Sequence, residues 1–111
     1  MSSLDQIDPQ TLKLIVQKFG SREGVYGTLI CDKDGLPLQS DMASADAEAL
    51  AAHVASLMGK VHGVAEEIGR GELSFVNITL QEAEILIAPE SDFTLVVLKK
   101  LLKKGSARPK P

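Results

Sequence analysis

The sequence predicts an antiparallel α+β sandwich, and three observations carry this prediction. The chain has 111 residues, of which 44% are hydrophobic, so one small domain with a mainly aliphatic core is expected. The apolar periodicity gives the order helix, two strands, long helix, three strands. The last three strands are joined by turns too short for parallel crossovers, so they form a meander.

The first helix is expected over residues 9–19. Asp8 is a suitable N-cap, Pro9 fits the first helical position, and Gly20 follows the end. The apolar residues at helical spacing on one face are Leu12, Ile15, Val16 and Phe19.

Two strands follow, at 25–31 and 35–40. Gly27 inside the first strand predicts a bulge or a close backbone approach. Pro37 has no N–H for a sheet ladder, so the second strand is expected at a sheet edge.

The link between these strands, Asp32-Lys33-Asp34-Gly35, has two interpretations. Two aspartates at this spacing begin an EF-hand calcium loop, but that loop needs a glutamate at its twelfth position, where this chain has Ala43. Asp-Gly between two apolar runs is typical of a hairpin turn, which is the prediction made here.

Residues 44–70 predict one long helix, with Ser44 as its cap. At 100° per residue a core face spans about 120° to 240°. It contains Ala47, Leu50, Ala51, Val54, Leu57, Met58, Val61, Ala65 and Ile68. A stripe of small residues, hereafter the small-residue stripe, lies opposite: Ala45, Ala49, Ala52, Ser56, Gly59 and Gly63.

The small-residue stripe is a predicted contact surface for another helix. Alanine is the best helix former, so a plain solvent-exposed helix would also explain the alanines. It would not explain Gly59 and Gly63, each of which costs about 1 kcal/mol relative to Ala inside a helix. A two-fold dimer is the simplest partner arrangement.

Three further strands are expected at 72–80, 83–89 and 92–100, and the segment beyond Gly105 is expected to be disordered.

No catalytic, cofactor or metal constellation is found in the sequence. Cys31 is the only cysteine and lies in an apolar run, which favours a buried, unreactive thiol. His53 and His62 are nine residues apart, so they lie on opposite sides of the long helix and cannot share a metal. A non-enzymatic protein without a cofactor is therefore expected.

Charge is distributed unevenly along the chain. Residues 99–111 contain no acid and six of the 12 basic residues, while all 15 acidic residues precede them. The six are Lys99, Lys100, Lys103, Lys104, Arg108 and Lys110. This basic tail is either solubilising or a contact for an anionic membrane or an acidic partner. Nucleic acid is not expected, because the body is acidic and poor in aromatic residues.

The first ten residues do not resemble a secretion signal, so a cytoplasmic location is expected.

Residues 24–100 resemble the Roadblock/dynein light-chain family. The features that carry the resemblance are "DKDGLPL" at 32–38 and "ILIAPESDFTLVV" at 85–97, at the separation seen in that family. The resemblance implies a profilin-like fold, with a five-stranded antiparallel sheet sandwiched by the long helix and the N-terminal helix. It divides the chain into an N-terminal helix and linker (1–23), the Roadblock-type domain (24–100) and the basic tail (101–111).

The resemblance also implies partners. Family members form homodimers, or heterodimers with a paralogous Roadblock protein, in which long helices pack together and third strands pair. Here that strand is 73–80, and the expected contacts include Ser74, Val76, Asn77 and Ile78. The implied role is a scaffold that binds or regulates a small Ras-like GTPase; the alternative is a light-chain or adaptor subunit of a cytoskeletal motor or a membrane-associated complex.

Overall fold

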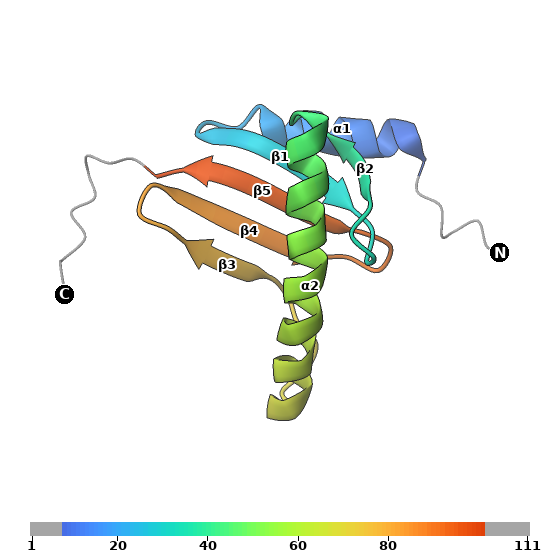
Figure 1. The fold of residues 1–111 in the computed structure, drawn as a ribbon, viewed down its shortest axis with the longest axis vertical. Helices are drawn as coiled ribbons and strands as arrows, with labels where there is room; N and C mark the ends of the chain where they lie inside the picture. Colours follow the sequence, from blue (N-terminus) through green and yellow to red (C-terminus); the bar gives the residue numbers. More distant parts are fainter. Residues whose placement is uncertain (1–7, 102–111) are drawn as a thin grey trace.

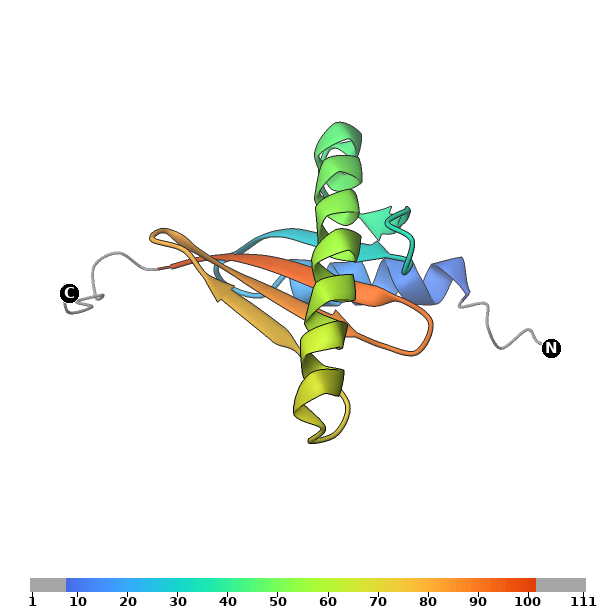
Figure 2. The ribbon, with the colours of Figure 1, turned by 60° about the horizontal axis from the view of Figure 1, so that its bottom comes forward.

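A five-stranded antiparallel sheet with one helix on each face forms the fold (Figures 1 and 2). This computed structural model describes residues 8–101. In chain order the elements are α1 (Pro9–Gly20), β1 (Val25–Cys31), β2 (Pro37–Ser40), α2 (Ser44–Ile68), β3 (Val76–Thr79), β4 (Ala83–Pro89) and β5 (Thr94–Lys100). The predicted α+β class and the order of its elements are confirmed. Neither helix of the described part is long and apolar enough to cross a membrane.

The strands lie in the order β2-β1-β5-β4-β3, and each pairs antiparallel with its neighbours. The first and last strands of the chain, β1 and β5, are therefore adjacent near the middle of the sheet. β2 and β3 are the two edges, so the edge position expected for Pro37 is confirmed. Among residues 8–101, the other edge, β3, pairs with β4 alone.

Side chains of β1 alternate between the two helices, as a pleated strand requires. Leu29 and Cys31 are fully buried on the α2 side, and Ile30 is fully buried on the α1 side. The α2 side forms the larger core, in which the strands meet Ala47, Ala51, Val54 and Met58. The α1 side is closed by Leu12 and Val16.

The link between β1 and β2 is a hairpin turn, as predicted. The Asp32 Oδ1 atom accepts hydrogen bonds from the backbone N–H groups of Asp34 and Leu36, both at 2.9 Å. The Gly35 N–H donates to the Asp32 carbonyl oxygen at 3.1 Å. Gly35 has a φ of +91°, a conformation that favours glycine. The Asp32 side chain therefore holds the turn together.

A second glycine prediction, at Gly27, is also confirmed. The pairing of β1 with β5 shifts between Val25 and Gly27, which marks a bulge. A Cβ atom on Gly27 would lie 3.0 Å from the Leu98 side chain and 3.3 Å from that of Met42. Glycine thus leaves room for these two side chains on the α2 face.

Several element boundaries differ from those predicted. The N-cap of α2 is Ala43, which has extended backbone angles and no capping side chain, so the prediction that Ser44 caps this helix is wrong. The helix ends at Ile68 because Gly69 adopts a left-handed conformation at the C-cap. Gly71 also has a positive φ, +108°, and residues 72–75 connect the helix to the sheet before β3 begins at Val76.

Candidate functional site

The C-terminal half of α2 runs past the edge strand β3 and beyond the sheet (Figure 1). Its apolar residues there have little sheet beneath them. Leu57 and Ile68, which the periodicity assigns to the core, are 36% and 63% exposed, so that assignment is wrong for these two residues. Val64 is 58% exposed. The helix is longer than the sheet that it covers, and this is the physical reason for the difference.

Leu57, Val64 and Ile68 form an apolar ridge on one flank of α2. At 100° per residue they lie within about 40° of one another. The opposite flank of the helix contacts the β1–β2 turn, where a Cβ atom on Gly35 would lie 3.3 Å from the Ala55 side chain. Phe75, just before β3, is also 57% exposed. The apolar ridge is therefore a large uncovered apolar surface beside the free sheet edge.

The small-residue stripe lies on the back of α2, away from the sheet. All six of its residues are exposed. A Cβ atom added to Gly59 or Gly63 would meet nothing within 4 Å. Packing within residues 8–101 therefore does not explain either glycine.

Three of the predicted strand contacts, Val76, Asn77 and Ile78, lie on the edge strand β3, whereas Ser74 precedes it, so the prediction that the strand begins before Ser74 is wrong. Ser74 and Asn77 are exposed, whereas Val76 and Ile78 are half-buried and pack against the larger core. Asn77 Nδ2 donates to Glu84 Oε2 at 3.4 Å. The structure thus separates the predicted interface residues into two groups, one on the back of α2 and one on β3 and the loop just before it.

Sequence reasoning missed Val64 and Phe75. The width of the apolar arc on α2 could have indicated Val64. When Val64 is included, the arc is wider than a helix needs in order to pack on one sheet, so part of it is available for a second contact.

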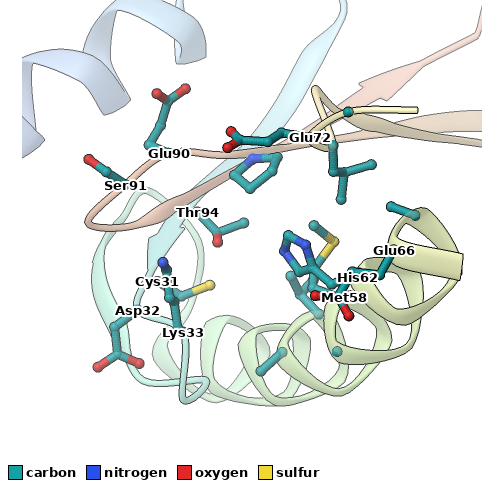
Figure 3. Close-up of a pocket in the computed structure, with 17 residues that line it drawn as sticks. Cys31, Asp32, Lys33, Met58, His62, Glu66, Glu72, Glu90, Ser91 and Thr94 are labelled. Atoms are coloured by element: carbon teal, nitrogen blue, oxygen red, sulfur yellow. The ribbon is translucent and has the colours of Figure 1, made fainter. Parts of the chain in front are cut away.

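A groove of about 690 Å³ opens on the flank of α2 that faces the β1–β2 turn (Figure 3). It lies between α2, the β1–β2 turn, the loop after α2 and the β4–β5 turn. Met58 and His62 project from α2 toward Cys31 and Thr94 on the strands. Three exposed glutamates lie on its rim: Glu66, Glu72 and Glu90.

Cys31 lines this groove but is not poised for nucleophilic chemistry. Burial, followed by the nearby charge of Asp32, raises the pKa of its thiol to about 11. The thiolate is the reactive form, so the buried thiol is inert at neutral pH. This agrees with its interpretation as a small core residue.

The raised pKa of Cys31 predicts a loss of stability at high pH. The unfolded thiol ionises near its ordinary value of 9.0, while the folded thiol stays protonated to about pH 11. Between these pH values the unfolded state binds fewer protons, so the free energy of unfolding falls as pH rises, by about 2–3 kcal/mol in total. Urea unfolding of wild type and Cys31→Ala from pH 8 to 11 measures this fall. The variant should lack it, and parallel curves would contradict the prediction.

Within residues 8–101, no group of three or more His, Cys, Asp or Glu side chains is arranged to hold a metal ion. The Asp32 Oδ1 atom is already used by the turn. His53 and His62 are both exposed.

Two residues of the basic tail fall inside the fold. Lys99 and Lys100 are the exposed last residues of β5. The other predicted tail residues, Lys103, Lys104, Arg108 and Lys110, lie outside the described residues, as does the predicted disorder beyond Gly105.

Solved structures share this fold at low sequence identity. A Roadblock/LC7 domain from Streptomyces avermitilis superposes with a TM-score of 0.74 at 17% identity, covering 79% of this chain and 77% of that one. MglB from Myxococcus xanthus superposes with a TM-score of 0.76 at 15% identity, covering 86% and 74%. These likenesses show the profilin-like sandwich that the resemblance implied.

Sequence comparison supplies the family. Two uncharacterized proteins of Methanocaldococcus jannaschii, MJ0310 and MJ1340, are each 31% identical over 85 residues, which is 76% of this chain and 75% of theirs. Residues 11–99 match the model of the Roadblock/LC7 domain, a span that includes all of the fold except the first two residues of α1 and the last residue of β5. The chain therefore belongs to the Roadblock/LC7 domain family.

Proposed function

We propose that the protein is a homodimer in which the β3 strands of two copies pair and each α2 covers part of the partner's sheet. The observation that carries this proposal is the overhang of α2, with its apolar ridge, beside a free edge strand. An edge strand that stays unpaired invites association, and a two-fold axis through paired β3 strands satisfies both copies equally. Pairing with a paralogous Roadblock protein would use the same surfaces.

The apolar ridge is large enough to matter for such a dimer. Leu57, Val64 and Ile68 are 36%, 58% and 63% exposed, so burying what remains of them contributes about 2–5 kcal/mol per copy before the entropy of association is counted. The overhang would rest on the partner's sheet, which continues past β3. This arrangement places the ridge, rather than the small-residue stripe, between the two helices.

The small-residue stripe remains a second candidate for the helix–helix contact, because its glycines lie in open space. We expect Gly59→Ala and Gly63→Ala each to raise the free energy of unfolding by up to about 1 kcal/mol, since alanine favours the helix and meets no obstacle. Chemical denaturation at a fixed protein concentration measures this gain.

Bulkier substitutions decide between the two surfaces. Gly59→Leu combined with Ala52→Leu should leave a ridge-mediated dimer intact by light scattering. Dissociation or aggregation of this variant would place the helix contact on the stripe.

We further propose that the dimer acts as a non-enzymatic platform that binds or regulates a small Ras-like GTPase in the cytoplasm. Membership of the family supports this role. Capture of GTP-loaded and GDP-loaded Ras-like proteins by the immobilised dimer is the test. Nucleotide-dependent capture supports regulation. Binding of an extended peptide alone would instead favour a light-chain or adaptor role.

A further inference from the structure

The groove beside α2 combines an apolar floor with an acidic rim. Met58, Leu73 and Val54 supply apolar surface, and Cys31 is a neutral thiol. At the rim, Glu66, Glu72 and Glu90 come from three different segments: the end of α2, the loop that follows it and the β4–β5 turn.

The rim carries a net negative charge. Among the described residues that line the groove, Lys33 is the single lysine or arginine. Asp32 also lines it, but its carboxylate is turned into the hairpin, where it accepts two backbone hydrogen bonds (Figure 3). Three glutamates against one lysine therefore face the solvent at this groove, and an occupant that is basic and partly apolar suits it.

Segment 102–111 of this same protein has that chemistry. Its sequence, LKKGSARPKP, carries four basic residues and no acid, with one leucine and two prolines. The chain thus holds both an acidic groove and a basic segment of matching character.

Geometry favours the segment of a second copy over that of the same copy. Thr94 lines the groove at one end of β5, and Lys100 ends the strand six residues later. A strand rises about 3.3 Å per residue, so Lys100 lies about 20 Å from Thr94. The helix α2 crosses the sheet between these two ends (Figure 1), so only the last residues of segment 102–111 could return to the groove of the same copy.

In one copy, the groove and the C-terminal end of β5 lie at opposite ends of the sheet. A two-fold axis perpendicular to the sheet exchanges these two ends, so it brings the groove of one copy and the C-terminal end of β5 of the other to the same end. With the β3 strands paired, the two β5 strands lie five strand spacings, or about 24 Å, apart, a gap that ten extended residues can span. We propose that segment 102–111 of each copy docks in the groove of the other, with its lysines and arginine against Glu66, Glu72 and Glu90. This inference rests on the proposed dimer.

Zero-length carbodiimide cross-linking of the full chain tests the proposal. Unlabelled and ¹⁵N-labelled protein are mixed, unfolded and refolded together, so that half of the dimers contain one copy of each. We expect cross-links that join Lys103, Lys104 or Lys110 of one isotope to Glu66, Glu72 or Glu90 of the other. Glu84 lies opposite Lys99 in the β4–β5 ladder, so its link within one copy is the internal control.

The outcomes separate this proposal from the dimer itself. A dimer by light scattering that gives the control link but no link between isotopes overturns the docking and leaves the dimer standing. Cross-links between segment 102–111 and the groove glutamates that occur only within one isotope would mean that the segment returns to its own copy. This result would also overturn the docking proposal. A monomer overturns both proposals.

A matched pair of variants tests the role of charge. Glu66→Gln, Glu72→Gln and Glu90→Gln are combined in one chain, and Asp46→Asn, Glu48→Gln and Glu67→Gln in a control with the same net charge. All six acidic residues are exposed, and the three control residues do not line the groove. The ¹⁵N heteronuclear NOE of residues 102–111 should drop at least two-fold in the groove variant and stay unchanged in the control. Equal values in both variants would exclude docking at these glutamates.

Discussion

Replacing Val64 and Ile68 with aspartate is expected to convert the proposed dimer into a folded monomer. Both residues are more than half exposed in the single chain, so the change costs the isolated fold little. In the proposed dimer both side chains are buried in each copy, and aspartate there would place charges without partners in an apolar contact. We expect the dissociation constant to rise at least about 100-fold, equivalent to about 3 kcal/mol.

Sedimentation equilibrium over a range of concentrations measures this shift. Leu14→Asp is the matched control, because Leu14 is 62% exposed on α1, away from the apolar ridge, and receives the same change of chemistry. The control should keep the wild-type dissociation constant. A double variant that stays dimeric with an unchanged constant would remove the apolar ridge from the interface.

Gly35→Ala is expected to cause the largest loss of stability among single methyl additions to the turns. The residue has a φ of +91°, and its new Cβ atom would lie 3.3 Å from the Ala51 carbonyl oxygen and 3.3 Å from Ala52 Cα. Both neighbouring atoms belong to the backbone of α2, which cannot move aside as easily as a flexible side chain can. Backbone strain and crowding together predict a loss of about 2–4 kcal/mol.

Gly71→Ala separates these two causes. Gly71 has a φ of +108°, and a Cβ atom there would meet nothing within 4 Å. The control therefore carries the backbone strain alone, and a loss of about 1–2 kcal/mol is expected. Urea unfolding of both variants at one protein concentration gives the difference that belongs to the helix contact. Equal losses would mean that the turn does not press on α2.

Local patterns were enough to predict most of the fold. Asp8 and Pro9 marked the start of α1, where the Asp8 side chain accepts a hydrogen bond from the Gln10 N–H. The bounds predicted for β1 and β4 match the structure. These elements are determined by caps, turns and apolar runs that lie within a few residues of one another. The extent of β3 was not predictable in this way, because it depends on where Gly69 and Gly71 turn the chain after α2.

The candidate site was less accessible from the sequence. Periodicity placed Leu57 and Ile68 on the core face, because it reports the direction of a side chain around the helix. It does not report whether the sheet reaches that far along the helix axis. The groove joins segments separated by up to 63 positions, from Cys31 to Thr94, and no local pattern connects them.

The adjacency of β1 and β5 has a consequence for synthesis of the chain. The pairing of these strands joins Val25 to Lys99, so the middle of the sheet contains residues from both ends of the domain. During translation α1, β1 and β2 leave the ribosome long before the strand that completes their core. The sheet can close only after residue 100 has emerged, so a chain stalled before β5 should stay open and depend on chaperones until release.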